Sequence, residues 1–188
     1  VAQYMAGLEG GVDGIDLSIR KGTVYSLLGP NGAGKTTTVE ILEGLRLASS
    51  GSVSVLGVDI SEGYGPIRKR VGVLPQNFEP FDLLTPVEAV GYWADLFEMR
   101  LGRKDVESLI ELVGLEARKK AMSKTLSGGE KRKLGIAMSM VNDPELLFLD
   151  EPTTGLDPRA RRDLWTLIEE TKKRGTTIVL TTHYLDEA

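Results

Sequence analysis

The pattern of apolar positions predicts several short strands along the chain. Four runs of four to six residues contain no charged residue, as is typical of buried strands: 24–28, 71–74, 146–149 and 176–181. Two further segments, 52–56 and 12–19, alternate between apolar and largely polar residues, as half-buried strands do. In the second of them, we expect an edge strand of an antiparallel sheet with Val12, Ile15, Leu17 and Ile19 as its apolar residues.

Helix signals lie between and after these strands. The first helix is expected after residue 37 and ends at Gly44. Thr85, Pro86 and Glu88 have the N-cap, first-turn proline and capping-box pattern of a helix that runs to about Met99. Further helices are expected at 104–113, 116–122, 127–140 and 158–174. Because residues 77–144 contain no strand pattern, they predict a helical subdomain inserted into the α/β core.

The composition is that of an ordinary globular protein, and it limits the function classes. The chain has 188 residues, of which 41% are hydrophobic and 27% are charged, so it can form one domain with a substantial core. The net charge of −4 gives no electrostatic reason to expect a nucleic-acid partner. There is no cysteine for a disulfide or a thiolate metal site. No apolar run approaches the ~18 residues of a membrane span, so we expect any membrane role to work through a partner.

A glycine-rich stretch between the first buried strand and the first helix carries the strongest chemical signal. It has the spacing G-x-x-x-x-G-K-T of a phosphate-binding loop and comprises Gly29, Pro30, Asn31, Gly32, Ala33, Gly34, Lys35, Thr36 and Thr37. Glycines let backbone N–H groups approach phosphate oxygens, and the helix start adds partial positive charge. Lys35 is expected to reach the β- and γ-phosphates, and the Thr36 hydroxyl to bind Mg²⁺. The alternative is a plain glycine turn, and the loop by itself fits a kinase, a GTPase or an ATPase.

Polar residues follow three of the other buried strands, at positions where ligand-binding residues of parallel sheets gather. Asp150 and Glu151 follow one of them. We expect Asp150 to hold the metal, directly or through water, and Glu151 to polarise the water that attacks the γ-phosphate. Gln76 and His183 follow two others, and His183 could reach the γ-phosphate from its strand end. Taken alone, a glutamine or a histidine at such a place is more often an ordinary loop or surface residue.

A second candidate anion site lies at the start of the helix expected at 127–140. Ser127 fits its N-cap, and Gly128 and Gly129 fall in its first turn, where two adjacent glycines weaken a helix. A helix start with a free hydroxyl and two exposed backbone N–H groups can bind an anion, although a plain capped helix explains this segment equally simply. Asp157, followed by Pro158, is predicted to cap the next helix.

In combination and in this order, these residues resemble the nucleotide-binding domain of an ATP-binding-cassette (ABC) transporter. The matching motifs are Walker A at 29–37, the Q-loop at Gln76, the signature at 126–130, Walker B at 146–150 followed by Glu151, the D-loop at 155–157 and the switch His183. The resemblance implies that two such domains meet head to tail, with each ATP held between the Walker A of one and the signature of the other, here Ser127, Gly128, Gly129 and Glu130. It also implies that Gln76 contacts the metal and the γ-phosphate, and that the helical block carries the docking groove for a membrane partner.

Three features depart from the family pattern. Glu130 stands where many members have Gln, and we expect Lys131 or Arg132 to offset its charge. The family's adenine-stacking aromatic residue is missing at the matching position, and Tyr4, two residues away, is the candidate to replace it. The chain ends just after the switch histidine, whereas family members continue for several more strands and helices, so we expect a truncated domain.

The sequence therefore predicts one α/β domain of the P-loop NTPase class over residues 1–188. A RecA-like parallel-sheet core and an N-terminal antiparallel β subdomain are expected in 1–76 and 145–188, and the helical subdomain in 77–144. The implied function is a Mg²⁺-dependent ATPase that is peripheral at the cytoplasmic face of the membrane and powers a separate integral membrane permease. Its expected catalytic residues are Lys35, Glu151 and His183, its metal ligands Thr36, Gln76 and Asp150, and its D-loop residue Asp157. The D-loop and the signature resemble those of exporter-type members more than those of nutrient importers.

Two other functions within this resemblance are considered. A soluble ABC ATPase that acts on DNA is disfavoured because only 92 positions separate Lys35 from Ser127, too few for the coiled coils of the DNA-repair members. Members that act on the ribosome usually carry two cassettes in one chain, and one is present here. A non-hydrolysing regulatory cassette is disfavoured by the intact Lys35, Asp150, Glu151 and His183.

Overall fold

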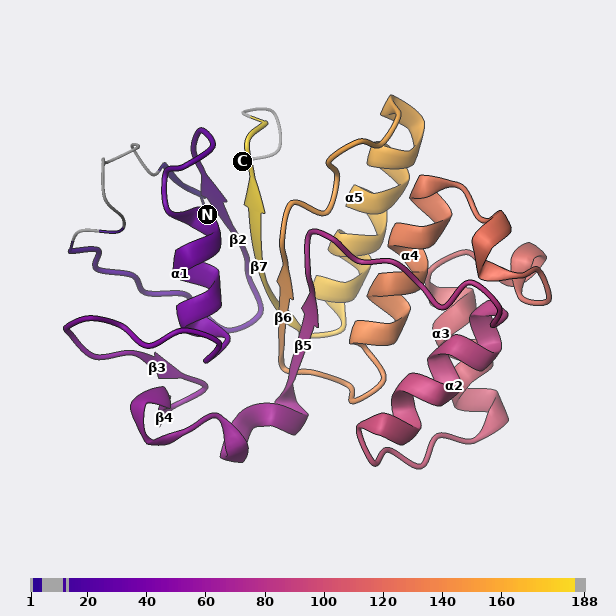
Figure 1. Cartoon of the computed structure of the whole chain (residues 1–188), viewed down its shortest axis with the longest axis horizontal. Coiled ribbons are helices and arrows are strands. Elements are labelled where there is room, and N and C mark those ends of the chain that lie inside the picture. Colours follow the sequence, from indigo (N-terminus) through magenta and orange to yellow (C-terminus); the bar gives the residue numbers. More distant parts are fainter. Residues whose placement is uncertain (1, 5–11, 13, 185–188) are drawn as a thin grey trace.

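A five-stranded sheet runs through the centre of the protein (Figure 1). The structure is a computed structural model, and it describes residues 2–4, 12 and 14–184. The sheet consists of β1 (Ala2–Tyr4), β2 (Val24–Leu28), β7 (Thr177–Thr182), β6 (Leu146–Leu149) and β5 (Val71–Leu74), in that order. Every neighbouring pair is parallel, so the carboxyl ends of all five strands meet at one edge. The four apolar runs of the sequence coincide with β2, β5, β6 and, shifted by one residue, β7.

Both faces of the sheet are apolar, which explains why these strands contain so few polar residues. In β6, Leu147 and Leu149 enter one hydrophobic cluster, whereas Leu146 and Phe148 enter a second cluster on the opposite face. All four side chains are buried. A strand that is buried on both faces has no solvent-facing position, so it reads as a continuous apolar run.

One face of the sheet is covered by α1 (Lys35–Leu42) and by a small hairpin. The hairpin pairs β3 (Ser54–Val55) with β4 (Val58–Asp59) in antiparallel fashion. Two short 3-10 helices, Ile60–Glu62 and Gly65–Arg70, then lead into β5. Apolar side chains of α1 and β3 pack on the β6 residues of this face.

The other face is covered by α4 (Gly128–Ser139) and α5 (Pro158–Lys173). The helices α2 (Pro86–Leu96) and α3 (Arg103–Leu112) pack against α4 on its side away from the sheet (Figure 1). Two 3-10 helices, Glu116–Arg118 and Ser123–Thr125, separate α3 from α4. Among the residues that the structure describes, no helix is both long and apolar enough to cross a membrane.

The block 77–144 contains helices and no strand, as predicted, since all of its residues are described. Its last helix, α4, nevertheless belongs to the same hydrophobic cluster as β5, β6 and α5. The helical block and the sheet are therefore joined by a continuous apolar core, and the boundaries of the predicted subdomains at 76/77 and 144/145 stay a prediction.

The predicted helix starts are confirmed. Thr85 and Glu88 form a capping box, in which Glu88 N–H donates to Thr85 Oγ1 at 3.3 Å and Thr85 N–H donates to Glu88 Oε2 at 2.8 Å. Asp157 caps α5 by accepting from two backbone N–H groups, and Pro158 is its first residue. The helix that begins at Pro86 ends at Leu96, a few residues before the predicted end.

The strand predicted at 12–19 is wrong within the described residues of that segment. Residues 14–20 form no strand, and the N-terminal strand of the sheet, β1, pairs in parallel with β2. Val12, Leu17 and Ile19 still pack against the core, which explains their alternation, because a periodic pattern reports which side chains face the core and not whether the backbone has a partner strand. The antiparallel part is limited to the β3–β4 hairpin, where the strand predicted at 52–56 is reduced to two residues.

The helix predicted at 116–122 is also wrong. The segment forms one 3-10 turn at Glu116–Arg118, and its backbone then continues into a second at Ser123–Thr125. The Ser123 backbone and hydroxyl both donate to Leu84 O, at 2.9 and 2.7 Å. The predicted helix does not form because this contact with a distant residue competes with it, and local helix propensity does not include such contacts.

Candidate active site

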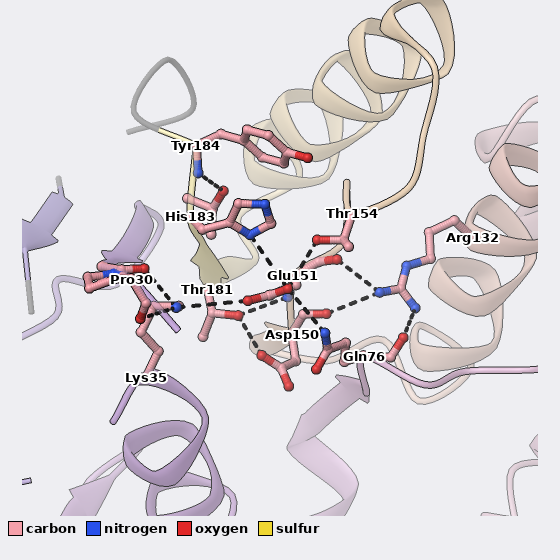
Figure 2. Close-up of polar contacts among 12 residues, drawn as sticks. Pro30, Lys35, Gln76, Arg132, Asp150, Glu151, Thr154, Thr181, His183 and Tyr184 are labelled. Atoms are coloured by element: carbon pink, nitrogen blue, oxygen red, sulfur yellow. Dashed lines mark hydrogen bonds and ion pairs between the residues drawn. The ribbon is translucent and has the colours of Figure 1, made fainter. Parts of the chain in front are cut away.

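The carboxyl edge of the sheet brings together the four segments that the sequence singled out. The glycine-rich loop follows β2, Gln76 follows β5, Asp150 and Glu151 follow β6, and His183 follows β7. These strands are parallel and adjacent in the order β2-β7-β6-β5, so their ends line up although they are far apart in the chain. Figure 2 shows the side chains of Lys35, Gln76 and His183 pointing toward Glu151 at the centre of this edge.

The glycine-rich loop has the backbone conformation that its glycines allow. Gly32 and Gly34 have φ values of 81° and 85°, in the left-handed region that favours glycine. The loop closes with a hydrogen bond from Ala33 N–H to Pro30 O at 3.2 Å, and α1 begins directly after Gly34 without a side-chain cap. A helix start that lacks a side-chain cap offers backbone N–H groups to an anion.

Lys35, the first residue of α1, is turned into this loop. Its side chain is 5% exposed, and Nζ donates to the carbonyl oxygens of Gly29 at 2.8 Å and Pro30 at 3.1 Å. The same ammonium lies 3.8 Å from Glu151 Oε1. The loop and Glu151 therefore hold a buried positive charge beside the open helix start. Thr36 is exposed at the next position of the helix.

Glu151 occupies the centre of the site and contacts residues from three strand ends (Figure 2). Its Oε2 accepts hydrogen bonds from Gln76 Nε2 and Thr154 Oγ1, both at 3.1 Å, and lies 3.6 Å from His183 Nδ1. Its backbone N–H donates to Thr181 Oγ1 at 2.8 Å. The residue has a φ of 44°, which costs an ordinary residue of order 1–2 kcal/mol and has to be held by surrounding contacts.

Asp150 is a buried carboxylate next to this centre. Its Oδ1 accepts a hydrogen bond from the Thr181 hydroxyl. Burial raises the pKa of the Asp150 carboxyl, and Glu151 raises it further, whereas the Thr181 hydrogen bond and the charges of Arg132 and Lys35 oppose the shift. No ion pair with Asp150 is found among residues 2–4, 12 and 14–184, so a cation bound here would relieve the cost of burying its charge.

The predicted metal ligands suit Mg²⁺ in their chemistry. Thr36, Gln76 and Asp150 would offer a hydroxyl, an amide and a carboxylate oxygen, which are hard donors of the kind that Mg²⁺ prefers. Within the described part of the chain, no three carboxylate, histidine or cysteine side chains converge on one point. The protein would therefore supply only part of the metal's coordination shell, and phosphate oxygens and water would supply the rest, as is usual for Mg²⁺.

The start of α4 lies apart from this site, on the face of the sheet opposite α1. Ser127 Oγ accepts from Glu130 N–H at 3.3 Å, and Glu130 Oε2 accepts from Ser127 N–H at 2.8 Å, so the hydroxyl expected to be free takes part in a capping box. Ser127 and Gly128 remain exposed. Ser127 borders a shallow hollow of about 140 Å³ between the starts of α4 and α5, whose lining also includes Gly129, Lys133, Asp157 and Arg159.

Asp157, on the other side of this hollow, caps α5. Its Oδ1 accepts from Ala160 N–H at 3.1 Å and Arg159 N–H at 2.9 Å. These hydrogen bonds lower the pKa of the Asp157 carboxyl, because they favour its charged form. The D-loop residue therefore has a defined structural role as a helix cap.

The expected partners of Glu130 are wrong. Glu130 Oε1 pairs with Arg118 Nε at 3.4 Å, whereas Lys131 points to Glu79, with 2.7 Å between Nζ and Oε2. Arg132 is buried and turned inward toward the site. Sequence analysis gave Arg132 no role in the site, because it lies within a run of four charged residues, 130–133, and nothing in the sequence distinguishes it from its neighbours.

The adenine-stacking candidate cannot be placed. The backbone of Tyr4 belongs to β1, but its side chain lies outside the described part of the structure, as do the neighbouring residues 5–11. The other predicted residues fall into two groups. One group gathers at the carboxyl edge of the sheet: Gly29 to Thr37, Gln76, Asp150, Glu151 and His183. The other lies at the start of α4 and beside the separate hollow, which Ser127, Gly129, Glu130 and Asp157 line and Gly128 adjoins in sequence.

The parallel sheet with a glycine-rich loop between β2 and α1 defines a P-loop nucleotide-binding fold. Comparison with protein families adds that the sequence model described as "ABC transporter" matches residues 12–154. This match covers more than half of the chain, which therefore belongs to the ABC transporter family.

The relatives in this family include ATP-binding proteins named for export and for drug resistance. The Nod factor export ATP-binding protein I of Cupriavidus metallidurans is 42% identical over 180 residues, which are 94% of this chain and 59% of the relative. The daunorubicin/doxorubicin resistance ATP-binding protein DrrA of Streptomyces peucetius is 42% identical over 94% of this chain and 54% of its own length. The chain thus spans less than two thirds of the length of these relatives.

Solved structures of similar fold are also ABC cassettes. The ATP-binding cassette MJ0796, a dimer in a post-hydrolysis state bound to ADP and Pi, has a TM-score of 0.78 and 27% identity, covering 90% of this chain and 78% of that one. CbiO1 from Clostridium perfringens, part of the ABC transporter complex cbiONQ, has a TM-score of 0.83 and 30% identity, covering 93% of this chain and 72% of that one.

Proposed function

We propose that this chain is the Mg²⁺-dependent ATP-hydrolysing part of an ABC exporter, and that it powers translocation by a separate membrane permease. The observation that carries the proposal is the convergence of Lys35, Gln76 and His183 on Glu151 at the end of the sheet. A buried carboxylate surrounded by donors beside a phosphate loop is the arrangement that a water-activating residue needs.

The chemistry follows from these positions. The N–H groups of the loop and of the α1 start bind the phosphates, and Lys35 Nζ moves from the Gly29 and Pro30 carbonyls to the β- and γ-phosphate oxygens. The developing negative charge is then held by groups that are already in place, which lowers the barrier. Bound Mg²⁺ would supply charge neutralisation at the phosphates, with Thr36, Gln76 and Asp150 as its ligands from the protein.

Glu151 orients the attacking water and accepts its proton. In the structure, its Oε2 is occupied by Gln76 and Thr154, and His183 Nδ1 is within 3.6 Å. When the γ-phosphate is present, His183 and Gln76 turn toward it, and the Glu151 carboxylate becomes available to water. Binding of the nucleotide thus determines whether the Glu151 carboxylate is occupied by Gln76 and Thr154 or free to bind water.

A second cassette completes the site. Ser127 and Gly128 are exposed at the start of α4, and Ser127 and Gly129 line a hollow there. The chain's own phosphate loop does not share this hollow, because α4 and α1 cover opposite faces of the sheet. A head-to-tail partner would present its phosphates to this helix start. The similarity to a dimeric cassette bound to ADP and Pi supports the arrangement.

The permease would dock beside the helical block. A cavity of about 150 Å³ opens between β5, α2 and the 3-10 helix Gly65–Arg70 and is lined by Val73, Trp93 and Phe97, among others. Large apolar side chains are exposed on α2 and in the segment before it: Phe81, Leu83, Tyr92 and Leu96. Docking there would hold the chain at the cytoplasmic face of the membrane. The export function named for the Nod factor relative suggests the direction of transport.

Two substitutions test the proposal. Glu151→Gln keeps the hydrogen-bonding shape but removes the base, so ATP should bind as in the parent while turnover falls by about a hundredfold or more. Lys35→Ala removes a buried charge that binds phosphates, so ATP affinity should fall by roughly tenfold to a hundredfold. Binding is measured with a fluorescent ATP analogue and turnover by phosphate release. Hydrolysis by the Glu151→Gln variant at the parent rate would refute the assigned role.

A further inference from the structure

Arg132 is the most extensively hydrogen-bonded side chain near the site, and its contacts are all to the backbone. It lies on α4, is 8% exposed, and extends toward the backbone of Gln76 and Glu151 (Figure 2). All five of its N–H groups find carbonyl oxygens: Nε donates to Pro152 at 3.1 Å, Nη1 to Pro75 at 3.0 Å and Gln76 at 2.9 Å, and Nη2 to Asp150 at 3.1 Å and Glu151 at 3.0 Å.

These carbonyls belong to two separate segments that leave the sheet side by side. Leu74 and Leu149 form the last residue pair between β5 and β6. The segments that follow them, 75–76 and 150–152, therefore start side by side at the end of the sheet. Backbone groups that leave a sheet need new hydrogen-bond partners. Arg132 provides them for both segments at once, in the planar fork geometry that only a guanidinium has.

The two segments carry the two side chains whose meeting defines the site. Gln76 Nε2 donates to Glu151 Oε2 at 3.1 Å. Arg132 fixes the carbonyl of each of these residues, and it therefore fixes the backbone from which both side chains extend. Glu151 also has the unfavourable φ of 44°, which its N–H bond to Thr181 and its carbonyl bond to Arg132 hold from both sides.

Arg132 belongs to the helix that begins with Ser127. Five residues of α-helix span about 7.5 Å, so Arg132 lies about one and a half turns from that helix start. The neighbouring lysines do not share this role: Lys131 pairs with Glu79 on the surface, and Lys133 lies 3.7 Å from Asp163 on α5.

We propose that Arg132 is a positioning residue for ATP hydrolysis, which aligns Gln76 with Glu151 and ties their geometry to the position of α4. The inference rests on the proposed function, since it assigns Arg132 to the same reaction. A shift of α4 when its start meets the nucleotide of a second cassette then changes the backbone at 75–76 and 150–152. Arg132 therefore couples the start of α4, which would face the second cassette, to the position of the Glu151 carboxylate in the same chain.

The variants Arg132→Gln and Arg132→Lys test the proposal, with Lys131→Gln as the matched control one position away. Glutamine can replace two of the donated hydrogen bonds and lysine at most three. We expect ATP affinity within about twofold of the parent in both variants, because the phosphate loop is untouched. The turnover number should fall by about tenfold or more in Arg132→Gln and by less in Arg132→Lys. Lys131→Gln should match the parent in both quantities.

Amide hydrogen exchange distinguishes positioning from general stability. In Arg132→Lys, exchange should accelerate in 75–78 and 150–154 while the rest of the sheet keeps the parent's protection. The proposal is overturned if turnover stays at the parent value, if turnover and ATP affinity fall in parallel, or if both variants fail to fold, since the last two results assign Arg132 to stability alone. A parent protein that does not hydrolyse ATP would refute the proposed function. The exchange pattern would still test whether Arg132 holds the backbone of 75–76 and 150–152.

Discussion

The side-chain amide of Gln76 donates a hydrogen bond of 3.1 Å to the carboxylate of Glu151, from a position 75 residues earlier in the chain. The two residues follow neighbouring parallel strands, and their backbones are held by the same arginine. This contact joins the residue that would sense the nucleotide to the residue that would activate water.

Replacing Gln76 by alanine should slow hydrolysis without weakening ATP binding. The variant loses the amide that would contact the γ-phosphate or its metal in the reacting state, an interaction with a charged group that is worth about 1.5–3 kcal/mol and corresponds to roughly a tenfold or larger fall in turnover. Contacts of the loop with the phosphates remain, so the affinity should change little. Steady-state phosphate release gives the turnover number, and Asn77→Ala, at the exposed next position, is the control. An unchanged turnover number in Gln76→Ala would remove this residue from the mechanism.

Glu43, at the end of α1, should make the protein less stable as the pH rises. Burial, together with the carboxylates of Asp150 and Glu40, raises the pKa of Glu43 to about 7 from 4.5. Between these values the folded chain holds a proton that the unfolded chain has released, so stability falls as the pH rises through this window and levels off above about pH 7.

The variant Glu43→Gln removes this effect. At pH 8 its free energy of unfolding should exceed that of the parent by about 1–3 kcal/mol, less than the full shift implies because the side chain is partly solvated. At pH 5 the two proteins should differ little. Urea denaturation at both pH values measures the difference, with Glu62→Gln on the surface as the control. A gain of the same size at pH 5 and pH 8 would contradict the ionisation argument.

The two glycines at the start of α4 should respond differently to alanine. A Cβ on Gly129 would lie 2.9 Å from Ala160 Cβ on α5, whereas a Cβ on Gly128 would meet no atom within 4 Å. Gly129→Ala should therefore push the helices apart and cost about 1–3 kcal/mol. Gly128→Ala should leave stability unchanged or raise it by up to about 1 kcal/mol, through higher helix propensity.

Urea denaturation of the isolated variants compares them. An equal loss in both would mean that the tight packing of Gly129 against α5 has no energetic consequence. The comparison also separates two reasons for a glycine in this turn, namely packing against α5 at Gly129 and open access to the helix N–H groups at Gly128.

Much of the fold was predictable because the central strands are buried on both faces. Their apolar runs matched β2, β5, β6 and β7 nearly residue for residue. The strand predicted at 12–19 was wrong because the alternation of this segment reflects packing on the core without a partner strand. The turns at 116–125 were predicted as a helix because they depend on a hydrogen bond from Ser123 to Leu84, and a contact with a residue so distant in the sequence is not visible in the local pattern.

The site was predictable where chemistry and spacing coincide, as in the phosphate loop and at Asp150 and Glu151. Arg132 was missed because its partners are five backbone carbonyls from two distant segments, and carbonyls leave no mark in a sequence. The pairing of Glu130 with Arg118 was missed for a similar reason, since the sequence suggested its nearest neighbours.

The central claim is that one chain's phosphate loop is completed by the α4 start of a second chain. Mixing two inactive variants, Lys35→Ala and Ser127→Arg, tests it most directly, because a mixed dimer would contain one site in which the loop and the helix start are both intact. Phosphate release is measured for each variant alone, for the mixture and for the parent. We predict that the mixture regains hydrolysis that neither variant has alone. A mixture that stays inactive while the parent hydrolyses ATP would contradict the account.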